Sequence, residues 1–293
     1  MKKITINEKQ LLGKGGTANV YRVDSDKLLK LYKNEHTLEE IQLQKDIDRA
    51  ATVAGIPCAI SYDIVECDGQ YGIIYEILSA PTTHEALVNF PDQREEYIKK
   101  YASLLKDLHE ISIPNKPFVN KKVQKLASIE RLKPYTSDEE YSLILNIINN
   151  IPERNTFTHG DYNLNNVMHT DEGALVIDLA DCGYSHPIFD LATVHLWLID
   201  MAPFGEEFML SNTGLTVAEA KSLWKVFINE YFNDASADEI IQYENNIKVH
   251  AALSFIILSE LMFEAQMGPN NVAELVKTNL MPLLTAGYDK ILF

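Results

Sequence analysis

The chain has 293 residues, of which 46% are hydrophobic and 23% are charged, as is usual for a soluble globular protein. Its net charge of −16 argues against nucleic acid or an anionic membrane surface as a partner, because both attract clustered Lys and Arg. The length allows one large domain or two modest ones.

The chain also lacks the usual sequence signals of export. Its first residues become polar at once, without the apolar core of a secretory signal. The longest apolar stretch, residues 249–263, is too short to span a bilayer and contains His250 and Glu260. Three widely spaced cysteines form no C-x-x-C pair, which argues against a disulfide framework or a zinc site. We therefore expect a cytoplasmic protein, and the sequence identifies no protein partner.

A glycine-rich loop lies between two predicted strands near the beginning of the chain. Residues 4–12 alternate between apolar and polar side chains, and Gly13, Gly15 and Gly16 precede a second alternating segment. Glycines let backbone N–H groups approach a phosphate closely, where a Cβ would obstruct them. A Walker or Rossmann loop would open into a helix instead of a strand. On its own such a loop is more often only a tight turn.

The next two predicted elements are a strand and a helix. Lys30 lies in the strand at residues 28–32 between apolar neighbours, so its ammonium is expected to face a charge partner; Lys33 is the alternative. The helix covers residues 37–54, because Thr37 and Glu40 have the spacing of a capping box and a Gly follows the last turn.

A hairpin and a series of helices are predicted beyond that helix. The hairpin joins residues 59–67 to residues 71–78 through the turn Asp68-Gly69. The predicted helices cover residues 93–109, 120–132, 137–148, 187–200, 216–232, 236–263 and 271–286.

Candidate catalytic groups are concentrated between residues 158 and 178. Asp161 and Asn166 precede a second predicted hairpin, at residues 167–177, and Asp178 follows it. Closing this hairpin brings Asn166 and Asp178 together. A carboxylate and an amide oxygen suit Mg²⁺, a hard cation that shares its site with phosphates. Asp161 then remains available to accept a proton.

This pattern resembles the catalytic loop of the protein-kinase-like superfamily, with H-x-D-x-x-x-x-N followed by a second Asp after a hairpin. The Gly between His159 and Asp161, and the later Pro187 and Asp190-Leu-Ala, resemble the aminoglycoside phosphotransferase and choline kinase branch. The resemblance implies an α+β, two-lobed protein-kinase-like fold. Residues 1–79 would form a small lobe with an antiparallel sheet and one helix, and residues 80–293 a larger, mainly helical lobe.

The resemblance also implies ATP, Mg²⁺ and a set of residue roles. Asp161 would accept the hydroxyl proton during transfer of the γ-phosphate. Asn166 and Asp178 would hold Mg²⁺. The nucleotide would be bound by Lys30, Gly13, Gly15, Gly16, and the strand end at Glu76 and Leu78. His159 and Asp190 would support the loop.

One position departs from the family pattern. The family places a Glu on the helix at residues 37–54 to pair with the strand lysine, and the alignment puts Gln44 there. Glu40 and Asp48 share the helix face with Gln44 at i, i+4 spacing. We select Glu40 as the partner of Lys30.

The resemblance also implies that the acceptor is a small-molecule hydroxyl compound: aminoglycoside, choline or ethanolamine, amino-alcohol, or sugar-like. A cationic acceptor is one alternative, although helical acids are more often a solvated face and helical aromatics more often core. Its candidate contacts are Asp200, Glu206, Glu207, Glu260, Glu264, Trp197, Trp224 and Tyr243.

Two other functions remain open. A pseudokinase that binds nucleotide without transferring phosphate is the second hypothesis, and the missing helix Glu is its only support. Protein-kinase activity is disfavoured, because Asp190 follows Asp178 too closely to leave room for an activation segment.

Overall fold

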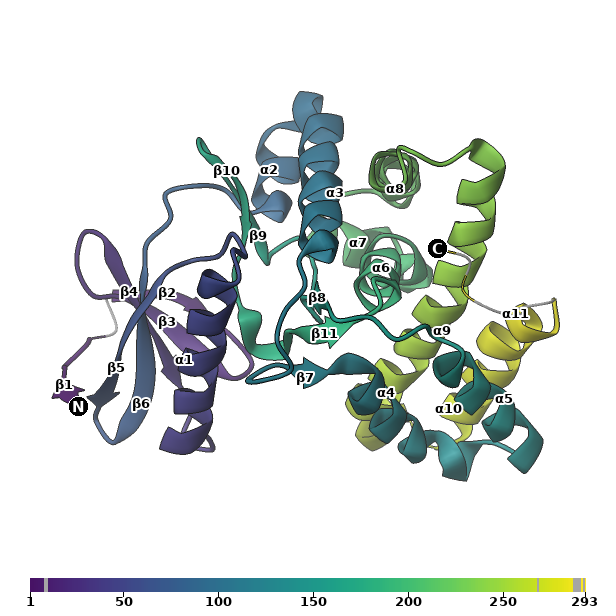
Figure 1. Cartoon of the computed structure of the whole chain (residues 1–293), viewed down its shortest axis with the longest axis horizontal. Coiled ribbons are helices and arrows are strands. Elements are labelled where there is room, and N and C mark those ends of the chain that lie inside the picture. The colour runs from purple at the N-terminus through teal and green to yellow at the C-terminus, as the bar shows by residue number, and fades with distance from the viewer. Residues whose placement is uncertain (8–9, 268, 287–290, 292) are drawn as a thin grey trace. The chain divides into compact units, whose positions relative to one another are not determined.

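A six-stranded sheet organises the N-terminal part of the chain in the computed structural model (Figure 1). Its strands, in spatial order, are β1 (Lys2–Lys3), β5 (Ser61–Cys67), β6 (Gln70–Glu76), β4 (Lys27–Tyr32), β3 (Ala18–Arg22) and β2 (Leu11–Lys14). The pairing is antiparallel everywhere except between β1 and β5, which run parallel. The predicted antiparallel sheet is therefore confirmed for five strands, and β1 makes the whole sheet mixed.

The structure describes all residues except 8–9, 268, 287–290 and 292, and for residues 262–267 and 269–270 it describes the backbone only. The chain divides into two compact units. The first comprises Met1–Thr82 and Asn166–Ala180, and the second comprises Thr83–Asn165 and Asp181–Phe293. The lobe boundary at residues 79 and 80 stays a prediction.

The strand predicted at residues 4–12 is wrong over most of its length. Among the described residues of this span only Leu11 and Leu12 are in a strand, residues 8–9 lie outside the described part, and Ile4 instead donates its N–H to Glu66 O at 2.9 Å beside β5. Ile4 and Ile6 still pack against the apolar cluster under the sheet. The alternation therefore reflected burial of these side chains without a continuous ladder of backbone hydrogen bonds.

Strand β4 and helix α1 (Leu38–Val53) position the first candidate group. Side chains alternate between the two faces of a strand, and Leu29 and Leu31 of β4 pack in one apolar cluster while Tyr32 packs in another with Ile41 of α1. Lys30 therefore shares the sheet face of Tyr32, the face that α1 covers. Helix α1 packs against β5 and β6 (Figure 1).

The predicted hairpin after the catalytic loop is present and belongs to the first unit. Strands β9 (Val167–Thr170) and β10 (Gly173–Val176) pair antiparallel. Backbone hydrogen bonds tie them to the rest of that unit, from His169 N–H to Pro81 O, from Val176 N–H to Pro57 O and from Ala59 N–H to Val176 O.

The second unit is mainly helical. Its helices are α2 (Thr83–Asn89), α3 (Arg94–Glu110), α4 (Lys121–Ile129), α5 (Asp138–Asn149), α6 (Ile188–His195), α7 (Glu206–Thr213), α8 (Val217–Tyr231), α9 (Ala237–Met267), α10 (Pro269–Leu275) and α11 (Met281–Thr285). A small sheet with the order β7 (Val119–Asn120), β11 (Gly183–Ser185), β8 (Thr156–Thr158) completes it. Helix α3 packs on α8, and α6 packs on α9. Together with the first unit, this confirms the predicted α+β class.

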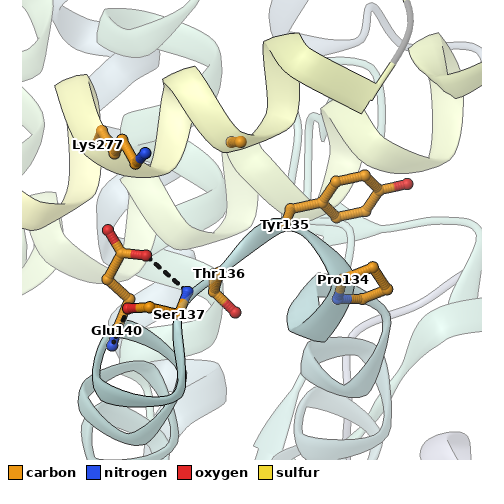
Figure 2. Close-up of a pocket in the computed structure, with 7 residues that line it drawn as sticks. Pro134, Tyr135, Thr136, Ser137, Glu140 and Lys277 are labelled. Atoms are coloured by element: carbon orange, nitrogen blue, oxygen red, sulfur yellow. Dashed lines mark hydrogen bonds between the residues drawn. The ribbon is translucent and has the colours of Figure 1, made fainter.

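Helix starts follow the sequence signals closely. Thr37, Ser137 and Thr216 each accept a hydrogen bond from the backbone N–H three residues later, and a Glu returns the bond in each case. Figure 2 shows the box of Ser137 and Glu140 at the beginning of α5. Such boxes satisfy N–H groups that have no partner within the helix. In the described part of the chain, no helix combines the length and hydrophobicity that crossing a membrane requires.

Candidate active site

An ion pair in the first unit brings two predicted site residues together. Lys30 Nζ lies 2.7 Å from Asp178 Oδ1, although the residues are 148 positions apart in the chain. The Lys30 side chain is 15% exposed and that of Asp178 is 44% exposed. Because water reaches the pair on the Asp178 side, the pair contributes only modestly to stability.

The partner selected for Lys30 on helix α1 was wrong. The Glu40 carboxylate accepts hydrogen bonds from the N–H and hydroxyl of Thr37, at 2.7 and 3.1 Å. The carboxylate that was predicted to pair with Lys30 therefore belongs to the capping box at the N-terminus of α1. Lys30 pairs with Asp178 instead.

Asp48 is an acid of α1 on whose pKa the charge of Lys30 acts. Its buried carboxylate accepts hydrogen bonds from Tyr75 OH at 2.6 Å and from Gln44 Nε2 at 2.8 Å. Burial raises the pKa of Asp48, while these two hydrogen bonds and then the charge of Lys30 partly offset that rise. Gln44, which was predicted to occupy the position of the family's Glu, thus supports an acid one turn further along the helix.

The base of the β9–β10 hairpin joins the two predicted metal ligands. Ile177 N–H donates to Asn166 O at 2.9 Å, so the residues preceding Asp178 lie against Asn166. Asp178 has φ +58°, in the left-handed region that few residues other than Gly adopt. This backbone turns the Asp178 carboxylate out of the hairpin ladder, where Lys30 contacts it.

The glycine loop is a tight connection between β2 and β3. Gly15 N–H donates to Ala18 O at 2.8 Å, and a Cβ on Gly15 would lie 3.0 Å from that same oxygen. Lys33, the rival of Lys30, binds the loop instead: its ammonium donates to Gly16 O and its N–H to Thr17 O. A Cβ on Gly13 or Gly16 would meet no atom within 4 Å.

Glu76 and Leu78 lie at and just beyond the end of β6. Glu76 Oε1 accepts from Ile60 N–H at 2.7 Å, and Ile77 N–H donates to Asp26 O at 2.8 Å. Leu78 is half-buried. These bonds fix the path of the backbone, and it is the backbone that was predicted to bind the adenine edge.

In the second unit, the catalytic loop is built around a buried carboxylate. Asp190 accepts from His159 N–H and from Gly160 N–H, each at 2.7 Å. His109 Nε2 lies 3.2 Å from the same carboxylate, and His109 Nδ1 lies 2.7 Å from Tyr231 OH. Burial alone would raise the pKa of Asp190, but the hydrogen bond and charge of His109, with those of the loop, lower it.

Asp161 follows directly and is half-buried. Its N–H donates to His159 Nδ1 at 3.3 Å, and its Oδ1 accepts from Asn163 Nδ2 at 3.0 Å. The next residue, Tyr162, exchanges hydroxyl-to-carbonyl hydrogen bonds with Tyr101 of α3, at 2.7 and 2.8 Å. Both rings are buried, so the loop is fastened on each side of Asp161.

Sequence reasoning missed two supports of this loop. His109 was assigned to packing, yet it bonds Asp190, and Tyr231 completes that chain of contacts. Lys121 of α4 was not considered, yet it donates to Asp181 O at 2.6 Å. Only the Leu-His ending of α3 gave a signal for the first, and no local pattern marked the second.

The acids predicted to attract a cationic acceptor have partners of their own. Asp200 pairs with His195 at 2.9 Å, Glu260 pairs with Arg131 at 3.0 Å, and Glu206 accepts from Val217 N–H. Glu207 is exposed, and the side chain of Glu264 lies outside the described residues.

The aromatic candidates have different environments. Trp224 is buried and donates to Glu244 at 2.9 Å, so it belongs to the core. Tyr243 packs against Phe232 and Phe293, and Trp197 is half-buried. The contacts of Trp224 therefore leave it no part in an amine cage.

Two of the hollows on the described surface lie within the second unit. One is formed between the segment that leads into α5 and the π-helical segment Val276–Leu280, and Figure 2 shows Glu140 and Lys277 at its sides. None of the predicted site residues lines it. The other contains His109, Tyr231 and several aromatic residues, and so lies behind the carboxylate that holds the catalytic loop.

Comparison with known proteins identifies what the chain resembles. The sequence model of the phosphotransferase enzyme family matches residues 10–211. Among solved structures, ADP-bound aminoglycoside phosphotransferase APH(2'')-Ib has a TM-score of 0.54 at 18% identity, with 92% of each chain covered. A choline/ethanolamine kinase family protein from Mesorhizobium loti has a TM-score of 0.56 at 13% identity, covering 94% of this chain and 92% of that one. The streptomycin–ATP–APH(2")-IIa complex scores 0.57 at 16% identity, covering 87% and 85%. No curated protein sequence matches the chain.

Proposed function

Since the chain belongs to the phosphotransferase enzyme family, we propose that it transfers the γ-phosphate of ATP to a hydroxyl group of a small molecule, with Mg²⁺. By family and by its kinase-like fold it is a small-molecule kinase. The contact between Lys30 and Asp178 carries the proposal, because it joins a cation for phosphates and a carboxylate for a metal in one unit. Structures of the same fold bind ADP, or ATP with streptomycin, which supports a nucleotide as the donor.

The donor set of the first unit fits Mg²⁺. Asp178 offers an exposed carboxylate and Asn166 an amide oxygen at the base of the same hairpin. Among the described residues, no group of three or more His, Cys, Asp or Glu side chains could hold a metal. Mg²⁺ needs no such group, because one or two carboxylates together with substrate phosphates and water hold it. When bound, it would neutralise charge on the phosphate oxygens.

The protein's own groups would do the remaining work by positioning. Lys30 would leave Asp178 to contact the phosphates, and N–H groups of the glycine loop would face them. Asp161 would accept or orient the proton of the acceptor hydroxyl, held by the N–H bond to His159 and the bond from Asn163. Asp190 would keep the His159–Gly160 backbone in the shape that this requires. Fixed geometry and charge supply most of the rate in such reactions.

Radiolabelled ATP and a mixed library of alcohols and amines test this function. We expect Mg²⁺-dependent transfer of the γ-phosphate to a library member by the wild-type protein. Nucleotide binding without transfer to any alcohol, sugar or amino-alcohol would instead favour the pseudokinase hypothesis. Transfer to a peptide library in place of small molecules would contradict the proposal.

A further inference from the structure

Two lysines of α4 lie on one side of that helix, next to the catalytic loop. Lys121 and Lys125 are separated by four residues, a spacing that stacks side chains on one helix face. The first residue of α4 is fixed by β7, which pairs with β11, and by Asn120, whose side chain caps the helix. The position of both ammonium groups is thus set by the fold of the second unit.

Two glycines make room for the Lys121 side chain. A Cβ on Gly160 would lie 3.1 Å from Lys121 Nζ and 2.9 Å from the Asp181 carbonyl carbon. A Cβ on Gly183 would lie 2.8 Å from Lys121 Cδ. The side chain therefore passes over both glycines and ends at Asp181 O, beside the residue that precedes Asp161. Gly160, between His159 and Asp161, is accordingly required by the Asp181 backbone carbonyl, with which a Cβ would collide, as well as by its φ of +82°.

Lys125 extends this positive region toward α9. Its ammonium donates to Ser254 Oγ at 2.8 Å, and Ser254 in turn donates to His250 O at 2.9 Å. Burial and then the charge of Lys121 lower the pKa of Lys125 to about 8. Burial and then the charge of Lys125 lower the pKa of buried His250 to about 3. The residue as a whole is half-buried, and its desolvated end is the ammonium group.

Lys121 and Lys125 are held by hydrogen bonds to a carbonyl and a hydroxyl oxygen, not by ion pairs. Lys122 and Lys106 in the same unit pair with Glu153 and Asp234, at 2.8 and 2.7 Å. Within the described residues, neither Lys121 nor Lys125 has an acidic side chain within ion-pair distance. The charges of Asp181, Asp190 and Asp161 do act on Lys121 from further away.

This arrangement has an energetic cost in a protein of net charge −16, which has ample carboxylates to pair with. Two desolvated ammonium groups that repel each other gain most when an anion lies between them. Ser254 Oγ accepts from Lys125 and donates its one proton to His250 O, so it positions the Lys125 ammonium for such an anion.

We propose that Lys121 and Lys125, the second of them positioned by Ser254, bind an anionic group, a carboxylate or a phosphate, carried by the acceptor whose hydroxyl is phosphorylated. The inference rests on the proposed function and specifies its substrate class: a hydroxy acid or a sugar phosphate, in contrast to an amino-alcohol. The acids that were predicted to bind a cationic acceptor also favour an anionic one, because Asp200, Glu206 and Glu260 already have partners within the protein.

Matched acceptors test the substrate class on the full-length protein with ATP and Mg²⁺. Glycerol, glycerate, glycerol 3-phosphate, ethanolamine and choline share a hydroxyl and differ in charge. We expect the lowest KM for glycerate or glycerol 3-phosphate, and comparison of these two separates carboxylate from phosphate recognition. In K125M and S254A we expect the KM for the preferred anion to rise at least tenfold. K221Q, at an exposed lysine of α8, should match the wild type. Preference for choline or ethanolamine, or an unchanged KM in K125M, would overturn the inference.

Binding gives a second readout that needs no turnover. Inorganic phosphate, titrated into the ADP-saturated protein, should raise the Tm of the wild type and leave that of K125M unchanged. K125M without phosphate should melt at a higher temperature than the wild type, since the substitution removes a desolvated and repelled charge; a merely structural lysine would lower the Tm. Phosphate stabilisation that persists in K125M contradicts the site. Such binding in a protein that phosphorylates nothing would refute the proposed function alone, and transfer to choline unaffected by K125M would refute the anion site alone.

Discussion

The two groups of candidate residues are held in opposite ways. In the first unit, Lys30 and Asp178 contact each other at an accessible position, and each is the partner of the other. In the second unit, the loop that carries Asp161 is fixed by fully buried Asp190 and by the reciprocal bonds of Tyr101 and Tyr162. Lys30 and Asp178, which must bind ligands, are therefore held by one partly exposed ion pair. The loop that carries Asp161, which must keep its shape, is held by buried hydrogen bonds. Substitutions in the first group should change binding, and those in the supports of the second should change stability.

Asp161→Asn should have the largest effect. The amide keeps the size of the side chain but cannot accept the hydroxyl proton, so we expect phosphate transfer to fall by on the order of 10³-fold. Nucleotide affinity and Tm should stay near the wild-type values. The measurements are initial rates with the preferred acceptor and ATP-analogue titration. If nucleotide affinity falls along with the rate, Asp161 has been assigned the wrong role.

Asp190→Ala should mainly affect folding. It leaves the N–H groups of His159 and Gly160 and the ring of His109 without their buried acceptor, at a cost of about 3 kcal/mol in the free energy of unfolding. Urea unfolding measures the change. Asp181→Ala is the control, because Asp181 is exposed and its contact with Lys121 uses the backbone carbonyl. Equal stability of the two variants would show that the buried carboxylate does not hold the loop.

Acid should destabilise the second unit through its buried histidines. The pKa of His186 is lowered by burial to about 4 and that of His250 to about 3, so the unfolded chain binds more protons between those values and about 6.5. Stability should therefore fall as pH decreases from 6.5, by up to about 2 kcal/mol per histidine between pH 7 and pH 5. His250→Gln should flatten this slope, because it removes the proton-binding site that burial disfavours. An unchanged slope in His250→Gln would mean that His250 does not stay neutral.

Lys30→Met should have the smallest effect on the fold. Removing one member of an accessible pair changes the free energy of unfolding by less than about 1 kcal/mol. Nucleotide affinity should fall about tenfold, the equivalent of one charge-assisted contact of about 1.4 kcal/mol. Calorimetric titration with ADP and a thermal melt measure both quantities. A change in the Tm of Lys30→Met without a change in ADP affinity would contradict the difference drawn between the Lys30–Asp178 pair and the loop of Asp161.

Local signals made much of the fold predictable. The capping boxes at Thr37, Ser137 and Thr216 and the turn at Asp68-Gly69 depend on residues within three positions of one another. The spacing from His159 to Asp178 likewise lies within one short segment, and the family match supports the resemblance drawn from it.

Partners far apart in the chain could not be found in this way. His109 meets Asp190 across 81 residues, and Lys125 meets Ser254 across 129, without a pattern that marks either pair. Glu40 shows a different kind of error, because two predictions used the same carboxylate: the capping box with Thr37 and the ion pair with Lys30. The capping box is the interaction that forms, because the N–H groups of the first turn are always adjacent to Glu40, whereas Lys30 lies on a separate strand.

The left-handed backbone of Asp178 limits how this position can change. Asp and Asn occupy that region more readily than other residues that carry a Cβ, and Gly adopts it without strain. The backbone conformation therefore favours Asp, Asn or Gly at residue 178, and the first two of these also offer an oxygen ligand. Substitutions at this position that preserve folding should thus be mainly to Asn or Gly. Relatives that lose the charge here should keep the hairpin, and a catalytically silent descendant could arise from a single base change without any loss of structure.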